Sequence, residues 1–269
     1  MAMIRKPAVA YQFYPGDAET LEKTICNMVD KTAKKLDAIA IIAPHAGYIY
    51  SGKVAGSVYS NARIPDNIIL LGPNHTGLGE PVSIFTGGEW DMPFGKLTVN
   101  AEISHLLIEE SDYFIDDPAA HLREHCLEVQ LPFIHHFNPK ASIVPITIMR
   151  LDLKGCLEIG KAIARVVKEY EGEVLLVVSS DMNHYESHEI TKKKDRKAID
   201  KILALDYEGL LKTVSKEDIS MCGVIPAAVA IAAAKELGAV GGKLIDYATS
   251  GDTSGDYNHV VGYAGILIK

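Results

Sequence analysis

The sequence predicts an α/β protein: a single-domain, three-layer α/β/α sandwich built around a mostly parallel or mixed central sheet. Short apolar runs rich in β-branched residues alternate with longer segments of helical periodicity along the 269 residues. The runs are apolar throughout, as is typical of strands that helices cover on both faces. The connections are short, and no Pro/Gly/Ser-rich linker interrupts them. We therefore expect one domain over residues 1–269.

Six apolar runs are predicted as buried strands because they are short and bounded by Gly, Pro or Asn. They are Ala38–Ala43, Asn67–Leu71, Pro81–Phe85, Ser142–Ile148, Glu173–Ser179 and Val260–Ile268, with a seventh expected at Lys243–Ala248. Helical periodicity lies between them. The predicted helices are Ala18–Leu36, Ala101–Glu110, Glu124–Phe137, Lys154–Tyr170, Lys192–Ala204, Tyr207–Val214 and Ile225–Leu237.

The composition is that of an ordinary globular protein, with 48% hydrophobic and 23% charged residues. A net charge of −8 argues against a surface built for nucleic acid, and the basic run Lys192–Lys197 is interleaved with Asp195, as on a solvated helix face. The N-terminus lacks the apolar core of a signal peptide. The longest apolar run, Val224–Ala234, is far shorter than the ~20 residues that span a bilayer. We expect a soluble, cytoplasmic protein with no nucleic-acid or membrane partner.

Three predicted strands run directly into turns that contain histidine. Ala38–Ala43 leads to His45, Asn67–Leu71 to His75, and Glu173–Ser179 to Asp181 and His184. Ligands of open α/β sheets bind at the carboxyl ends of the strands. One such histidine is equally typical of a simple turn, but three at corresponding positions favour a shared site held by rigid elements.

Cys222 is the fourth candidate. The four cysteines are widely spaced without a CxxC pair, so no disulfide framework is expected. Cys222 comes just before an apolar helix with Pro226 in its first turn. The positive end of a helix dipole favours thiolate, which is the form that binds metal or acts as a nucleophile. A buried structural cysteine is the alternative interpretation.

The segment His121–His125 also matches the H-x-x-E-H pattern of inverzincin proteases, with Glu128 one turn later. On a helix, His121, His125 and Glu128 would share a face, as metal ligands do. The pattern is short in a chain with ten histidines, and Asp117 and Pro118 predict a helix that starts here. We interpret His121 as part of that first turn. We assign His125 and Glu128 to the ligand-binding cleft, because they belong to the set of motifs described next.

Several motifs occur in order along nearly the whole chain. They are Ile42–Tyr48 (IAPHAGY) with Tyr50-Ser51-Gly52, Leu71–His75 (LGPNH), Glu124–Glu128 (EHCLE) with Leu131-Pro132-Phe133, Ser179-Ser180-Asp181 with His184, and Met221-Cys222-Gly223; Phe13-Tyr14-Pro15 and Gly262-Tyr263-Ala264 fit as well. Each motif is weak alone, but the ordered set is specific. The chain resembles the Memo family, the protein B type of the AmmeMemoRadiSam system.

The Memo family is similar to the class III extradiol dioxygenases, whose single α/β domain holds a non-haem iron. The resemblance implies a metal bound by His45, His75 and Cys222. Iron(II) is the expected metal, with copper or zinc as alternatives. The dioxygenases have a carboxylate where this chain has Cys222. A thiolate beside ferrous iron and oxygen is prone to oxidation, which argues against aerobic ring cleavage.

The resemblance also implies roles for other residues and partners. Asp181, His184 and His125 would be catalytic acid–base or supporting groups. Bacterial and archaeal members are often grouped with a radical SAM protein and an AMMECR-type protein, which implies a shared pathway. Eukaryotic members are named as binding proteins in receptor-driven cell motility.

Two functions from different classes remain open. The first is a metal-dependent redox enzyme acting on a small substrate, in which His184 moves protons and is tuned by the neighbouring Asp181. The second is a non-catalytic scaffold that holds a peptide or protein in a relict site. Replacing Cys222 or His184 by alanine would abolish turnover in an enzyme, whereas a scaffold would keep at least part of its affinity.

Residues predicted to line the substrate pocket complete the candidate site. They are Tyr48, Tyr50 and Glu128, with Trp90 as a further aromatic candidate. The loop Ser250–His259 is rich in Gly, Asp and Ser, as turns usually are. Its Asp252, Asp256 and His259 are weaker candidates, since the loop follows a predicted strand and has the length to fold over the cleft mouth. Neither a G-x-G-x-x-G nor a P-loop motif predicts a nucleotide.

Overall fold

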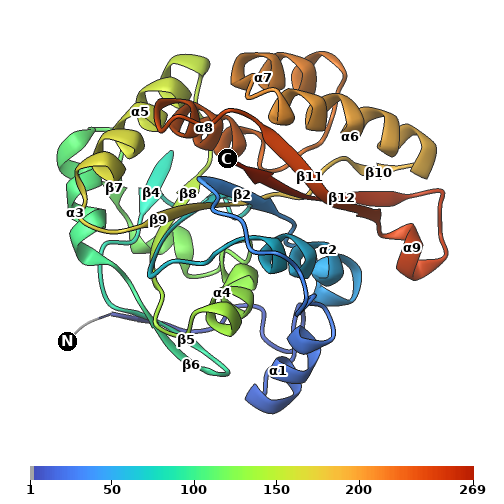
Figure 1. Ribbon diagram of the computed structural model, residues 1–269, viewed down its shortest axis with the longest axis horizontal. Helices are drawn as coiled ribbons and strands as arrows, with labels where there is room; N and C mark the ends of the chain where they lie inside the picture. The colour runs from blue at the N-terminus through green and yellow to red at the C-terminus, as the bar shows by residue number, and fades with distance from the viewer. Residues whose placement is uncertain (1–2) are drawn as a thin grey trace.

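The computed structural model describes residues 3–269, in which a nine-stranded mixed sheet separates two layers of helices (Figure 1). The strand order is β10-β12-β2-β9-β3-β8-β4-β7, and β11 pairs with β12. The strands are β2 (Ala40–Ala43), β3 (Asn67–Pro73), β4 (Val82–Ile84), β7 (Ile115–Asp116), β8 (Ser142–Ile148), β9 (Val174–Ser179), β10 (His184–Glu186), β11 (Gly242–Thr249) and β12 (Val260–Ile268). β2, β9, β3 and β8 form a parallel centre, flanked by the antiparallel β12 and β4. The predicted α/β sandwich with a mixed sheet is confirmed.

The central strands supply side chains to two separate hydrophobic cores, because successive residues of a strand point to opposite faces. In β2, Ala40 and Ile42 pack in one core and Ile41 and Ala43 in the other. β3 and β9 alternate in the same way. Both faces are therefore buried, which explains why the strands are apolar throughout in the sequence.

Helices close both cores (Figure 1). The first core is covered by α3 (Ala101–Glu110), α5 (Leu153–Glu169), α6 (His188–Leu203), α7 (Tyr207–Lys216) and α8 (Val224–Glu236). The second is covered by α1 (Ala18–Cys26), α2 (Tyr48–Asn61) and α4 (Leu131–Phe137), together with a small sheet of β1 (Ile4–Arg5), β5 (Glu89–Met92) and β6 (Gly95–Thr98). The 3-10 helices η1 (Pro118–His121) and η2 (Glu128–Gln130) and the short α9 (Gly251–Ser254) lie in loops.

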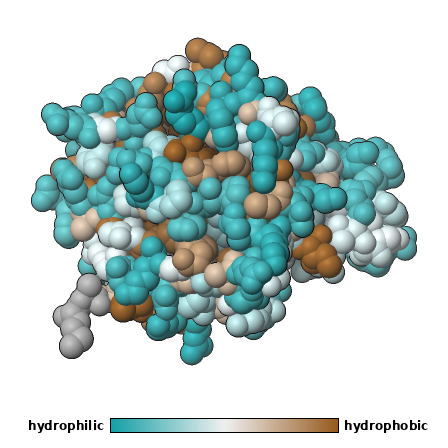
Figure 2. Space-filling view, turned by 60° about the horizontal axis from the view of Figure 1, so that its bottom comes forward, coloured by the Kyte–Doolittle hydropathy of each residue, from teal (hydrophilic) through white to brown (hydrophobic). Residues whose placement is uncertain are grey.

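The face in Figure 2 is mostly hydrophilic, with separate small apolar patches. Within residues 3–269, no helix combines the length and the apolar character needed to cross a membrane.

The helices of the structure differ from the predicted ones mainly at α1, at α2 and before α4. α1 ends at Cys26 instead of Leu36, because Asp30 accepts hydrogen bonds from the backbone and hydroxyl of Thr32 and forms a turn. α2 was not predicted, since its glycines disfavour a helix in sequence analysis. Gly56 is needed there because a Cβ atom would lie 2.1 Å from the carbonyl oxygen of Met28.

The predicted helix Glu124–Phe137 is the third difference. Only Leu131–Phe137 is α-helical, preceded by η2. The Glu124 carboxylate accepts the backbone N–H groups of His125 and Cys126 at 3.0 Å, which holds this stretch in a turn. The H-x-x-E-H residues therefore do not share a helical face, and the structure does not support a protease-type arrangement.

Arg5 and Glu128 form a buried ion pair that ties the N-terminal segment to η2. The Arg5 guanidinium also donates to the carbonyl oxygens of His121 and Glu124 and lies 4.3 Å from the centre of the Trp90 ring. Glu128 further accepts the N–H groups of residues 8 and 9 and the hydroxyl of Tyr14. Both side chains are fully buried, so each charge relies on the other as its counter-charge.

Asp195 on α6 is a second buried carboxyl group, and it joins the segment after β9 to β11. Its oxygens accept the N–H of Asn183 at 2.9 Å and the hydroxyl of Tyr247 at 2.7 Å. The Asn183 side chain in turn accepts the backbone N–H and the hydroxyl of Ser220. Burial raises the pKa of Asp195 to about 7.

We predict that Glu128→Gln lowers the free energy of unfolding by ~3–5 kcal/mol, because it leaves the Arg5 charge buried without a counter-charge. Chemical denaturation measures the change. Glu89→Gln is the control: it removes the partner of Lys96 in a partly exposed pair, which is worth less than ~1 kcal/mol. Equal effects of the two substitutions would contradict the structural role of Glu128.

We also predict that Asp195→Asn alters the pH dependence of stability. The folded-state pKa of Asp195 lies above its unfolded value, so its stabilising contribution is complete below about pH 4 and is lost as the pH rises through 7. Asparagine does not titrate. Between pH 5 and pH 8, the wild type should lose on the order of 2 kcal/mol relative to the variant, measured by urea unfolding. Parallel stability curves would show that Asp195 titrates normally.

Candidate metal centre

The parallel strands β2, β9 and β3 are neighbours in the sheet and end at the same edge. His45 follows β2, Asp181 follows β9 and His75 follows β3. The side chains that the sequence placed after separate strands are therefore brought together at one edge, as expected for a ligand site in an open α/β sheet.

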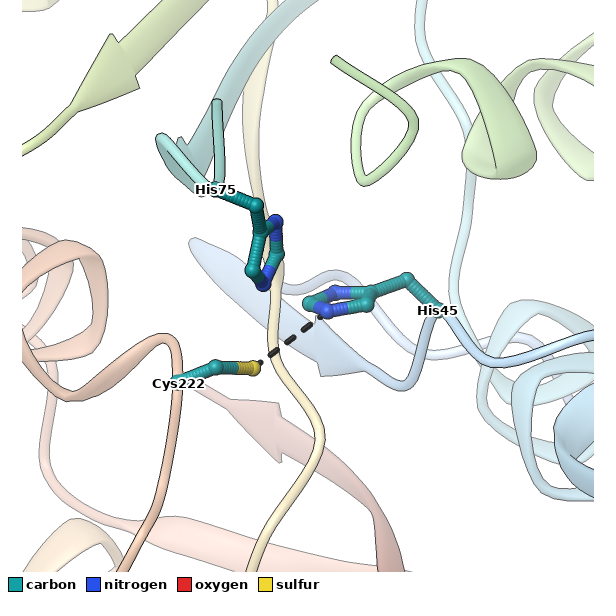
Figure 3. Close-up of side chains that lie close together, drawn as sticks. All are labelled: His45, His75 and Cys222. Carbon is teal, nitrogen blue, oxygen red and sulfur yellow. Dashed lines mark hydrogen bonds between the residues drawn. The ribbon is translucent and has the colours of Figure 1, made fainter. Parts of the chain in front are cut away.

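His45, His75 and Cys222 converge at this edge (Figure 3). The ligand atoms of the three residues all lie within 4.8 Å of one another, and the Cys222 sulfur is 3.3 Å from Nε2 of His45. His45 and Cys222 are the more enclosed members, whereas the His75 side chain is 33% exposed. The cluster therefore opens toward solvent on the His75 side.

Hydrogen bonds fix the orientation of both imidazole rings. The Ser179 hydroxyl donates to the carbonyl oxygen of Cys126 at 2.6 Å, so it accepts the Nδ1–H of His45 at 2.9 Å. Nδ1 of His75 lies 2.9 Å from the Glu124 carboxylate, which can only accept. With Nδ1 of each ring facing these groups, Nε2 is the nitrogen left to bind a metal.

Glu124 is the residue that the site prediction missed. Its two oxygens accept the backbone N–H and the Nδ1–H of His75 at 2.6 and 2.9 Å. These bonds and its other N–H partners hold the pKa of Glu124 at about 2, against the opposing effect of burial. A metal-ligating histidine usually donates the N–H of its other ring nitrogen to a carboxylate, which holds the ring in place. Glu124 occurs in a motif quoted above, but the sequence alone does not say which histidine it faces.

Cys222 lies two residues before α8, with Gly223 as the N-cap. Its sulfur accepts the backbone N–H of Asp181 at 3.2 Å. Burial and the Asp181 carboxylate raise the pKa of the Cys222 thiol, so the helix dipole does not lower it as the sequence suggested. A bound cation reverses this balance, because a coordinating thiol loses its proton to solvent.

His125 lies within the cluster. Its ring stacks on His75 with centroids 4.7 Å apart, and meets the edge of His45 at 5.4 Å. Burial and the neighbouring imidazoles lower the pKa of His45 and of His125. These imidazoles are therefore neutral at pH 7, as metal ligands and proton acceptors must be.

Asp181 and His184 lie near the cluster but do not pair as expected. The Asp181 carboxylate accepts the backbone N–H of His45 at 2.8 Å, and burial raises its pKa to about 6. Nδ1 of His184 faces the carbonyl oxygen of Ser220 at 2.8 Å. The group that orients His184 is thus a backbone carbonyl instead of Asp181, and burial lowers the His184 pKa.

The residues predicted to bind substrate have different surroundings. Tyr50 is 42% exposed in the first turn of α2. Tyr48 is buried and donates its hydroxyl to the carbonyl oxygen of Val129. Glu128 is enclosed with Arg5, and Trp90 is buried beneath the same guanidinium. Three of these four side chains therefore have structural partners.

The loop Ser250–His259 forms α9 and a turn. Asp252 accepts the N–H of Thr249, and Asp256 accepts the N–H of Asn258. The hydroxyl of Thr253 contacts the carbonyl oxygen of Ile49 at the start of α2. The two aspartates thus have local turn partners, and the loop touches the helix that follows His45.

The donor set fits a transition metal. Two imidazole nitrogens and one sulfur suit iron, copper or zinc, whereas Mg²⁺ and Ca²⁺ require oxygen ligands. Three protein ligands leave at least one coordination position for another molecule, as in catalytic sites.

Comparison with known proteins identifies the family of this chain. The sequence model of the family described as Memo-like protein matches residues 5–267. A MEMO1 family protein of Methanopyrus kandleri is 41% identical over 281 residues, covering 99% of each chain. Relatives named MEMO1 family protein from Pyrobaculum aerophilum and Aquifex aeolicus are 44% and 42% identical, each covering 98% of both chains.

A solved structure with a similar fold is also found. The crystal structure of an uncharacterized Escherichia coli K12 protein matches with a TM-score of 0.57, covering 85% of this chain and 98% of that one. At 11% identity, this match shows a shared fold alone. The match of the family over residues 5–267, together with relatives 41–44% identical over nearly their full length, shows that this chain belongs to the Memo family.

Proposed function

We propose that this protein binds iron(II) or copper at His45, His75 and Cys222 and is an oxidoreductase that acts on a small molecule. The observation that carries the proposal is the convergence of two oriented imidazoles and one thiol at a partly open edge of the sheet. When bound, such a metal supplies redox chemistry and positions for exogenous ligands. Zinc, the alternative, supplies Lewis acidity for hydrolysis instead.

The surrounding side chains support proton handling. His184 and His125 are neutral at pH 7, since burial lowers the pKa of each, and a neutral imidazole accepts a proton. Burial raises the pKa of Asp181 to about 6, which brings it close to the range in which a carboxyl group exchanges protons at neutral pH. We assign proton transfer to His184, with Asp181 and His125 as supporting groups.

The partly exposed His75 and Tyr50 are the groups that we assign to contact with the ligand. Buried Tyr48 would shape the wall of the site through its ring, because its hydroxyl already has a partner. Glu128 is not part of this proposal, since its ion pair with Arg5 occupies it. A pathway shared with a radical SAM protein and an AMMECR-type protein rests on the family resemblance alone.

We predict that protein purified without oxygen or chelators contains close to one equivalent of iron or copper. His75→Ala and Cys222→Ala should lose most of it, because each removes one of three ligands. Elemental mass spectrometry measures the content. His105→Ala, which changes an exposed histidine on α3, is the control. Folded wild type without iron or copper under any loading condition would refute the redox proposal and leave the cleft as a binding site.

We further predict that Glu124→Gln weakens metal binding about 10–100-fold while the three ligands remain. The amide cannot accept hydrogen bonds through both positions, so the orientation of His75 is lost. Competition with a chromogenic chelator measures the affinity. Glu109→Gln, at an exposed position of α3, should leave affinity unchanged. An unchanged affinity in Glu124→Gln would mean that the Glu124–His75 contact does not support the metal.

A further inference from the structure

A second group of metal-ligating side chains lies between α1 and α4. Glu22 and Cys26 are one turn apart on α1, so they share a face of the helix. His136 is in the last turn of α4, which packs against α1 (Figure 1). None of these three residues belongs to the centre at His45, His75 and Cys222.

The ligand atoms of this group are already close together. One Glu22 oxygen lies 3.0 Å from Nδ1 of His136 and 3.4 Å from the Cys26 sulfur. All three ligand atoms lie within 4.8 Å of one another. Ligands of a tetrahedral zinc ion, at the usual bond lengths, are separated by about 3.3–3.6 Å. Small side-chain rotations therefore suffice to place the three atoms around one ion.

We propose that Glu22, Cys26 and His136 form a second metal site, for Zn²⁺, that links α1 to α4. Sulfur, nitrogen and carboxylate oxygen are the three ligand types that zinc takes in proteins. On binding, the Cys26 thiol gives its proton to solvent and the sulfur joins the metal. A solvent molecule completes the coordination, since the Glu22 side chain is 57% exposed.

The site is partly prearranged by its surroundings. The His136 side chain is 15% exposed, and its ring meets the edge of Phe137 at 5.0 Å. A ring held in this way loses little freedom on binding. Glu22 also sits on the rigid helical part of α1, four residues before Cys26. Two of the ligands are thus fixed relative to one another by the helix.

Zinc at this position would have a structural consequence for the cleft. α1 follows the segment that carries Phe13 and Tyr14. Phe13 packs on the ring of His125 at 4.9 Å, and Tyr14 donates its hydroxyl to Glu128. Fixing α1 to α4 therefore restrains the segment that forms one wall of the metal centre. This role is independent of the function proposed for that centre.

The test uses the full chain in a Cys222→Ser background, which removes the sulfur of the first centre. Titration with Co²⁺, a spectroscopic substitute for Zn²⁺, should still produce a thiolate-to-cobalt charge-transfer band that saturates at one equivalent. Adding Cys26→Ser should abolish the band. Adding His136→Ala should weaken binding about tenfold or more, because one of three protein ligands is lost.

Matched controls separate this site from general surface binding. Glu19→Gln changes an exposed carboxylate one turn earlier on α1, and His105→Ala changes an exposed histidine on α3; both should leave the titration unchanged. Circular dichroism checks that each variant is folded. If Cys26→Ser or His136→Ala unfolds, Glu22→Gln, which changes the third ligand, is used in its place. Absence of the band in Cys222→Ser, or equal losses in the controls, would overturn the proposal.

Discussion

The whole centre depends on the parallel pairing of β2, β9 and β3. Their backbone hydrogen bonds fix three chain segments at a spacing set by the sheet, and all three end at the same edge. His45, Asp181 and His75 therefore arrive together from positions far apart in the sequence. The strands are buried on both faces, so the free energy of the two cores holds this edge in place. Cys222, two residues before helix α8, reaches the same edge from the C-terminal part of the chain.

Around this edge, the polar groups are arranged to present lone pairs inward. Ser179 and Glu124 each take the Nδ1–H of one ligand histidine, and the backbone of Ser220 takes that of His184. The outer groups are themselves held by backbone atoms: Ser179 by the carbonyl of Cys126, and Glu124 by three backbone N–H groups. Such support fixes the orientation of the imidazoles before any metal arrives, which lowers the cost of binding.

Sequence analysis predicted the architecture, and the placing of His45 and His75 at one edge of the sheet, because both depend on local patterns; the ligand roles of these residues and Cys222 came from the family resemblance. Apolar runs mark strands, and a histidine directly after a strand must lie at the sheet edge. It failed where tertiary contacts decide. Glycines that pack against Met28 hid α2, and the Glu124 turn shortened the predicted helix before α4. Glu128 was assigned to the cleft from the motif that contains it, and its ion pair with Arg5 was missed because the two residues are 123 positions apart and no periodicity connects them. The same limit hid the pairing of Glu124 with His75, 49 residues apart.

The central claim is that one transition metal is bound by two imidazoles and one sulfur. X-ray absorption spectroscopy at the metal edge of iron- or copper-loaded protein tests it most directly, since scattering from sulfur at about 2.3 Å differs from that of nitrogen or oxygen at about 2.0–2.1 Å. In a Cys26→Ser background, which removes the sulfur of the second proposed site, the account predicts one sulfur and two imidazole scatterers, with the sulfur contribution lost when Cys222→Ser is added. A shell of light atoms alone before that change, or a sulfur shell that persists after it, would contradict it.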